Sequence, residues 1–138
     1  QDALEQEVEQ GLVTLERKDS NIIIRIQEKG SFGSGSAKLD PGFQDVMARI
    51  SAVLAAKPGQ ILVAGHTDNI PISTGRFRSN WELSSARAVT VLQSMLQNKD
   101  IDENSIVVQG FADTRPMVPN DSPQNRAKNR RVEIQLVR

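Results

Sequence analysis

The order of apolar and polar positions predicts that the chain begins with a short helix and a β-hairpin. Residues 1–10 carry apolar side chains at helical spacing, and Gly11 is a typical helix stop. Two β-rich apolar runs follow at 12–15 and 21–26, with a polar stretch at 17–20 between them. This pattern indicates two strands joined by a turn.

Two longer segments have the spacing of amphipathic helices. The first begins at Asp40, an N-cap residue followed by proline, and places apolar side chains every three or four residues over 43–54. The second begins with Ser79 as N-cap and Glu82 three residues later, the pattern of a capping box, and carries its apolar stripe over 88–96.

Three further apolar runs predict the remaining strands. The continuous run at 61–64 is typical of a strand buried on both faces, and we expect it in the middle of the sheet. A strand at 106–108 and a short basic helix at 124–129 follow, and the alternation over 132–136 predicts a last strand with one polar face. The order ββ-α-β-α-β-α-β predicts an α/β (α+β) layered sandwich, in which helices pack against a mixed sheet.

Composition excludes several classes of function. The 138 residues contain 17 basic and 17 acidic side chains, so the formal net charge of zero argues against a nucleic-acid partner bound through bulk charge. The absence of cysteine excludes a disulfide scaffold, a thiol nucleophile and a cysteine-ligated metal. The apolar runs are too short to span a bilayer. Because the chain begins inside a predicted helix, we expect it to be a piece of a longer protein.

Polar side chains after the strand at 61–64 mark a candidate ligand site. Thr67 and Asp68 follow that strand, at the edge of the sheet where α/β proteins usually bind ligands. The next helix brings Arg87 back toward Asp68, and a carboxylate beside a guanidinium suits a ligand with both an ammonium and a carboxylate group. From spacing alone, alternatives remain: Asp68 folds its own turn, and Arg87 lies along the helix surface or pairs locally with Glu82 or Asp68. One face of this helix carries Asn80, Leu83, Ser84 and Arg87.

Other chemistries are less well supported by the residues. His66 is the only histidine, and with Asp68 alone it does not make a metal site, so we expect no metal. Ser84 and Ser85 have no second histidine to provide a base and its orienting partner. Asp68 and Asp113 are the one pair of acids that a hydrolase would use, and this enzyme hypothesis is kept as an alternative.

Two further features have two interpretations each. Trp81, the single tryptophan, is either a local plug over the core or part of a partner surface. The basic run at 126–131 is either a solvated helix end or a patch that faces an anion.

The sequence resembles the OmpA-like peptidoglycan-binding domain from about residue 61 to the end. The order of the motifs is more specific than any one of them. The motifs are Gly65-His66-Thr67-Asp68, Asn80-Trp81-Glu82-Leu83-Ser84-Ser85-Ala86-Arg87-Ala88, Gly110-Phe111-Ala112-Asp113 with Pro116, and Asn125-Arg126-Ala127-Lys128-Asn129-Arg130-Arg131-Val132-Glu133.

The resemblance implies non-covalent binding to the peptide stem of peptidoglycan, without catalysis, metal or cofactor. Asp68, beside Thr67 in its motif, and Arg87 would hold the zwitterionic end of diaminopimelate. Asn80 and Leu83 match the same motif and would shape the pocket. Arg130 would either contact the ligand or buttress the site.

The segment 69–79 resembles that of flagellar motor stator B subunits (MotB and PomB), and most closely the sodium-driven form, PomB. This resemblance implies the periplasmic part of a single-pass inner-membrane protein whose membrane helix is absent here. It also implies a homodimer, and a stator A subunit as partner through that membrane segment. Residues 1–29 would lie on the linker side and residues 30–138 would form the binding domain. The alternative is a general OmpA- or Pal-like envelope anchor with no role in motility.

Overall fold

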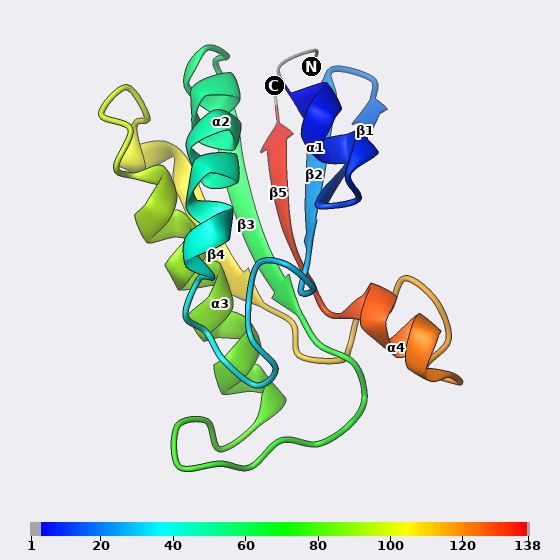
Figure 1. Ribbon diagram of the computed structural model, residues 1–138. Helices are drawn as coiled ribbons and strands as arrows, with labels where there is room; N and C mark the ends of the chain where they lie inside the picture. The colour runs from blue at the N-terminus through cyan, green and yellow to red at the C-terminus, as the bar shows by residue number, and fades with distance from the viewer. Residues whose placement is uncertain (1–3, 138) are drawn as a thin grey trace.

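The protein contains a five-stranded mixed sheet (Figure 1). The structure is a computed structural model that describes residues 4–137. The strands lie in the order β1-β2-β5-β3-β4, and every neighbouring pair is antiparallel except the parallel pair β3 and β4. The expected mixed α/β fold is therefore confirmed. The strands are β1 (Val13–Lys18), β2 (Asn21–Gln27), β3 (Gln60–His66), β4 (Ile106–Gly110) and β5 (Arg131–Val137).

Two long helices pack against one face of this sheet. In Figure 1, α2 and α3 lie side by side over that face, whereas α4 projects from the end at which β5 begins. The predicted start at Asp40 is a 3-10 turn: its carboxylate accepts a hydrogen bond from Gly42 N–H, and the α-helix begins only at Gln44. The helices are α1 (Glu5–Glu9), α2 (Gln44–Ala55), α3 (Asn80–Met95) and α4 (Pro123–Asn129), with 3-10 turns at Pro41–Phe43 and Glu103–Ser105.

The core lies between the sheet and these two helices. Alternate residues of the central strands point into it, as the period of two predicts, and the helical stripes close it from the other side. Its fully buried members include Ile24, Val63, Ile134, Leu136, Met47, Ile50, Val91 and Met95.

Three expectations about the strands were wrong. The strand at 61–64 is not buried on both faces: Leu62 and Ala64 are only half-buried, because the helices cover a single face of the sheet. Nor is it the central strand, a place that β5 takes. The first hairpin strand also runs on through Lys18, and Asp19, with a φ of 58°, begins the two-residue turn into β2.

Glycines allow α3 to approach the sheet closely. A Cβ atom on Gly65 would lie 2.0 Å from the backbone oxygen of Ser84, and one on Gly110 would lie 2.8 Å from the backbone nitrogen of Ser85. Only a residue without a side chain permits this approach. The contact seats the first half of α3 against the ends of β3 and β4, so that Arg87, one turn later, stays beside the loop that follows β3.

The N-terminal segment contributes to the same sheet, because β2 pairs with β5 and Leu4 is buried in the core. The division expected between residues 1–29 and 30–138 therefore stays a prediction about roles. Residues 1–3 of the predicted first helix lie outside the described residues. Over residues 4–137, no helix is long and apolar enough to cross a membrane.

Candidate functional site

A charged pocket lies where the loop after β3 meets the glycine-rich loop that follows β2. It encloses about 310 Å³. Three of its walls come from those two loops and the first half of α3, and Arg130, at the end of α4, completes it. Its lining residues are Glu28, Ser34, Gly35, Thr67, Asp68, Ile70, Pro71, Ile72, Asn80, Leu83, Arg87 and Arg130.

Asp68 is largely buried, and both of its carboxylate oxygens accept hydrogen bonds. Oδ1 accepts from Ile70 N–H at 3.0 Å, which folds the turn after β3. Oδ2 accepts from Nη1 of Arg130 at 2.7 Å. The interpretation that Asp68 folds its own turn is therefore correct, and the same side chain also lines the pocket.

Arg87 lies in the pocket wall and is only 2% exposed. Its Nε donates to Ser36 O at 2.7 Å and its Nη2 donates to Gly33 O at 3.0 Å, so the guanidinium holds the glycine-rich loop in place. Its Cζ atom also lies 5.0 Å from the centre of the Phe32 ring. Arg87 thus does not lie along the helix surface, and its ion pair is with Glu28, whose Oε2 is 2.8 Å from Nη2.

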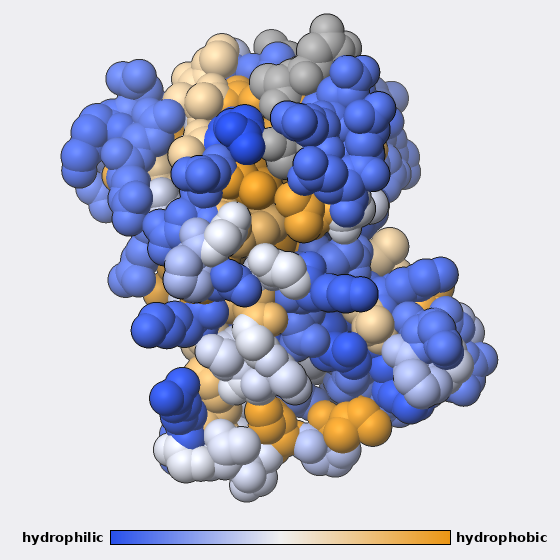
Figure 2. Space-filling model, in the orientation of Figure 1, coloured by the Kyte–Doolittle hydropathy of each residue, from blue (hydrophilic) through white to orange (hydrophobic). Residues whose placement is uncertain are grey.

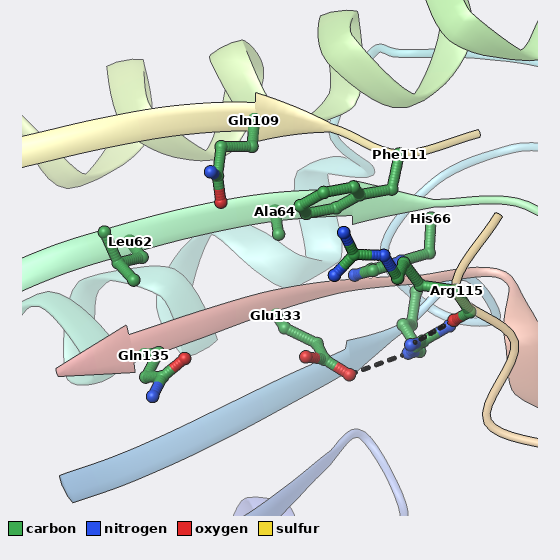
Figure 3. A pocket seen from close by; sticks show the side chains of 9 residues that line it. Leu62, Ala64, His66, Gln109, Phe111, Arg115, Glu133 and Gln135 are labelled. Atoms are coloured by element: carbon green, nitrogen blue, oxygen red, sulfur yellow. Dashed lines mark hydrogen bonds and ion pairs between the residues drawn. The ribbon is translucent and has the colours of Figure 1, made fainter. Parts of the chain in front are cut away.

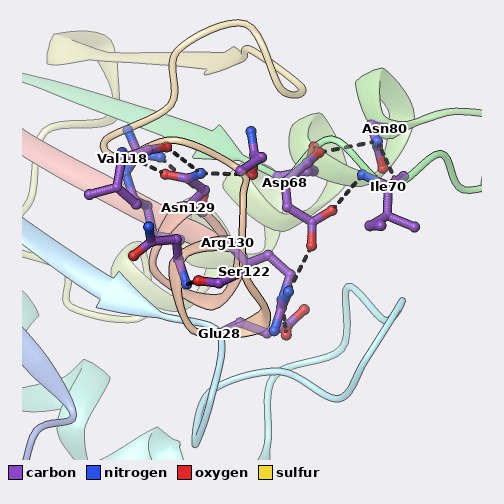
Figure 4. Close-up of polar contacts among 12 residues, drawn as sticks. Glu28, Asp68, Ile70, Asn80, Val118, Ser122, Asn129 and Arg130 are labelled. Atoms are coloured by element: carbon purple, nitrogen blue, oxygen red, sulfur yellow. Dashed lines mark hydrogen bonds and ion pairs between the residues drawn. The ribbon is translucent and has the colours of Figure 1, made fainter.

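Glu28 and Arg130 connect the two predicted site residues. Glu28 forms an ion pair with Nη2 of Arg87 through Oε2, and through Oε1 it accepts a hydrogen bond from Nε of Arg130 at 2.7 Å. Arg130 in turn donates to Asp68, and Figure 4 shows Arg130 between Glu28 and Asp68. Acids and bases therefore alternate along one chain of contacts: Arg87, Glu28, Arg130 and Asp68. Two positive and two negative side chains therefore meet in this pocket.

The two arginines respond differently to their surroundings. Burial lowers the pKa of Arg87, and the charge of Glu28 opposes that shift. Burial also acts against the charge of Arg130, but its hydrogen bonds to Asp68 and Glu28 outweigh it and raise the pKa of Arg130. Both guanidinium groups remain charged at any physiological pH.

Three other predicted residues, Thr67, Asn80 and Leu83, line the pocket, whereas Ser84 does not. Asn80 donates through Nδ2 to Ile70 O at 3.0 Å and thereby holds the loop after β3 against α3. Thr67 is buried and donates through Oγ1 to Asp68 O at 2.8 Å, and Leu83 is a buried apolar part of the wall. Ser84, on the same helix face, instead accepts a hydrogen bond from Ala112 N–H beneath the helix.

Sequence reasoning missed Glu28. The residue follows β2 with no motif around it, and only the pairing of β2 with β5, which sets Gln27 opposite Arg131, brings it beside Arg130. The backbone confirms this proximity, since Glu28 N–H donates to Arg130 O at 3.0 Å. No local spacing in the sequence signals a contact between residues 102 positions apart.

The open face of the sheet carries a second pocket of about 270 Å³ (Figure 3). His66 stacks on Phe111 there, with 5.3 Å between ring centres, and both of its buried ring nitrogens lack a hydrogen-bond partner in the described part of the chain. Burial, reinforced by the charge of Arg131, lowers the pKa of His66 to about 4, so its ring is neutral at neutral pH. Glu133 beside it accepts from Arg131 at 2.8 Å and from Arg25 at 3.0 Å.

The basic run at 126–131 is therefore not simply a solvated helix end. Arg131 is buried, and Arg130 lies in the first pocket. Asn129 is fully buried; it accepts from Met117 N–H at 2.8 Å and donates to Val118 O at 2.9 Å, which fastens the loop before α4.

The remaining candidates lie apart from the first pocket. Trp81 is 53% exposed and is no plug over the core. Asp113, the second acid of the hydrolase hypothesis, does not line the pocket that contains Asp68. Within residues 4–137, no three histidine, cysteine or acidic side chains are grouped as a metal site requires. Apolar surface lies at the lower edge of Figure 2, over the long loop between β3 and α3, whose Ile70 is 54% exposed.

Curated proteins with similar sequences include motility proteins. The chain is 36% identical over 122 residues to the uncharacterized protein YtxE of Bacillus subtilis, covering 88% of this chain and 50% of that protein. It is 33% identical over 117 residues to motility protein B of the same organism, covering 84% of this chain and 45% of that protein. The chain thus spans about half the length of the curated relatives that it matches.

Solved structures extend the likeness to the whole fold. The cell wall anchor of the T6SS from Pseudomonas aeruginosa is 36% identical with a TM-score of 0.92, over 99% of this chain and 94% of that one. The periplasmic domain of Helicobacter pylori MotB is 30% identical with a TM-score of 0.81, over 91% of this chain and 81% of that one. Residues 31–130 match the sequence pattern of the OmpA family, a range that includes all the pocket residues except Glu28. On this evidence the chain belongs to the OmpA family.

Proposed function

We propose that the charged pocket binds the peptide stem of peptidoglycan without cleaving it. The observation that carries this proposal is that Asp68 and Arg87, a buried acid and a buried base, line one pocket. A ligand that carries an ammonium and a carboxylate group matches such a pair of charges. The zwitterionic end of diaminopimelate is a group of this kind. The pocket volume of about 310 Å³ is sufficient for a group of that size.

Two residues would contact the ligand, and the others would support them. Asp68 accepts from the ligand ammonium, and Arg87 donates to the ligand carboxylate. Arg130 keeps Asp68 in place, because its Nη1 lies 2.7 Å from Oδ2 of Asp68. Thr67, Asn80 and Leu83 shape the walls. Binding rather than hydrolysis is supported because Asp68 is engaged on both oxygens and Asp113 lies outside the pocket.

This binding would anchor a membrane assembly to the cell wall from the periplasm. The flagellar stator is the first candidate for that assembly, because motility protein B is among the relatives and the MotB structure is of a periplasmic domain. The candidate includes a single-pass inner-membrane protein, a homodimer and a stator A subunit as partner. Its finer assignment to a sodium-driven, PomB-like stator rests on the resemblance of segment 69–79 alone.

A secretion machine is the second candidate, and one observation favours it. The cell wall anchor of the T6SS from Pseudomonas aeruginosa matches 99% of this chain with a TM-score of 0.92, against 0.81 for the MotB domain. This candidate is an envelope anchor with no role in motility, a property that it shares with the general OmpA- or Pal-like anchor that the sequence left open as the alternative.

Sedimentation with purified peptidoglycan sacculi tests the binding itself. We expect the domain to pellet with sacculi in a saturable manner, and free diaminopimelate to compete, because both ligands offer the same ammonium and carboxylate. Release of soluble muropeptides over time would instead support the hydrolase hypothesis. A domain that stays in the supernatant with intact sacculi would contradict the proposal.

Deletion of the gene in its own host separates the two assemblies. If the protein is a stator subunit, the deletion is expected to abolish swimming while leaving flagellar filaments in place, since torque requires an anchored stator. If the protein is instead an anchor of a secretion machine, the deletion is expected to leave swimming unchanged and to abolish secretion by that machine. Complementation with an Asp68→Ala chain should fail in whichever assay responds, since both candidates depend on the same pocket.

A further inference from the structure

The hydrogen-bond donors of Arg87 are already largely occupied. Nε has one N–H group, which donates to Ser36 O at 2.7 Å. Nη2 has two, and two acceptors lie at 3.0 and 2.8 Å from it, Gly33 O and Oε2 of Glu28. Among the described residues no acceptor is bonded to Nη1, so its two N–H groups are the donors left for a ligand.

A bidentate carboxylate therefore cannot bind Arg87 as it stands. A guanidinium offers two forks to a carboxylate, Nε with Nη2 and Nη1 with Nη2, and both use Nη2. An incoming carboxylate that takes both oxygens to Arg87 must displace either Gly33 O or Glu28 Oε2.

Glu28 is the acceptor that can leave at the lower cost. Gly33 belongs to a backbone loop that Arg87 and Thr90 fasten together, since Thr90 Oγ1 donates to Ala37 O. Glu28 is held by a side chain, and its Oε1 remains bonded to Nε of Arg130 at 2.7 Å if Oε2 moves away. The exchange also replaces one carboxylate partner of Arg87 by another, so the buried guanidinium stays paired.

We propose that Glu28 is an internal stand-in for the ligand carboxylate, which holds Arg87 in the free domain and moves off it when the ligand binds. This inference rests on the proposed function, because it concerns the same pocket and the same ligand. It assigns Glu28 a positioning role: the residue keeps a buried guanidinium paired when the pocket is free. The competition lowers affinity and makes each contact with the wall more readily reversible.

Titration calorimetry with a diaminopimelate-containing muramyl tripeptide tests the exchange. Glu28→Gln keeps the shape of the side chain but removes the charge that competes for Arg87, so we expect the Kd to fall by about three- to tenfold. Glu133→Gln is the matched control, because Glu133 also bridges two arginines but lies on the open face of the sheet. We expect the Kd of that variant to equal that of the wild type.

The outcomes separate the inference from the function on which it rests. An unchanged or higher Kd in folded Glu28→Gln, with a wild type that binds, overturns the inference alone. A wild type that binds neither sacculi nor the tripeptide overturns the proposed function and the inference together. Should Glu28→Gln not fold, Glu28→Asp shortens the side chain by one methylene group and weakens its contact with Arg87, so we expect the Kd to fall with this variant as well.

A structure of the wild-type complex gives a second, independent measurement. We expect the contact between Glu28 Oε2 and Arg87 Nη2, 2.8 Å in the free domain, to be broken, and the contact between Glu28 and Arg130 to be retained. A complex in which Glu28 still holds Arg87 overturns the inference even where the ligand is bound.

Discussion

Replacement of Arg87 by alanine is expected to cost the domain both its stability and its binding to peptidoglycan. The buried guanidinium is hydrogen bonded to Ser36 O and Gly33 O and paired with Glu28. Removing one partner of a buried ion pair typically costs about 3–5 kcal/mol. That loss is a large fraction of the roughly 5–15 kcal/mol that stabilises an ordinary domain.

Urea unfolding monitored by circular dichroism measures this loss. Arg25→Ala is the matched control, because Arg25 is likewise an ion-paired arginine but is half-buried and lies outside the pocket. We expect that control to lose less unfolding free energy and to keep its binding to sacculi. An Arg87→Ala variant as stable as the wild type would show that the contacts with the glycine-rich loop contribute little. Arg87→Lys keeps the charge but not the planar fork, so we expect its unfolding free energy to lie between those of Arg87→Ala and the wild type.

Replacement of Asp68 by alanine is expected to reduce sacculus binding to background while the domain remains folded. The substitution removes the acceptor that the ligand ammonium requires, and hydrogen bonds to charged groups contribute about 1.5–3 kcal/mol, or roughly 10- to 150-fold in Kd. Stability should fall by about 1–3 kcal/mol, because Ile70 N–H loses its acceptor while Arg130 keeps Glu28. Co-sedimentation with sacculi and circular dichroism together measure both effects.

Two variants sharpen the interpretation of this experiment. Asp68→Asn retains an oxygen for Ile70 N–H and changes only the charge, so it should bind as weakly as Asp68→Ala but be more stable. Asp113→Asn alters the exposed acid outside the pocket and should bind sacculi like the wild type. Wild-type binding by both Asp68 variants would refute the assignment of the ammonium site.

A pocket of this size implies that each contact with the wall is weak. A single zwitterionic group buries little surface, so the free energy gained at one site is small. Two domains joined in one assembly would bind a polymeric wall more tightly through effective concentration alone. The competition by Glu28 fits the same logic, because it makes a single contact easier to release without removing the specificity that two opposite charges provide.

Local patterns in the sequence were sufficient for the order of the elements and for two of the four charged residues in the pocket, and the motif resemblance added a third, Arg130. The stripe over 43–54, the cap at Ser79 and the alternation over 132–136 correspond to α2, α3 and β5. Asp68 and Arg87 were found because one follows a strand and the other stands two turns into the next helix. These are short-range features, and the spacing of residues along a strand or helix determines them directly.

Only the tertiary structure decided which charges meet. Asp68 pairs with Arg130, 62 positions away, and Glu28 joins Arg130 to Arg87 because β2 lies beside β5. Tertiary packing also placed the long helices on one face of the sheet, and Leu62 is half-buried because it lies on the other face. Strand order and register arise from packing of the whole core, which no local window of sequence contains.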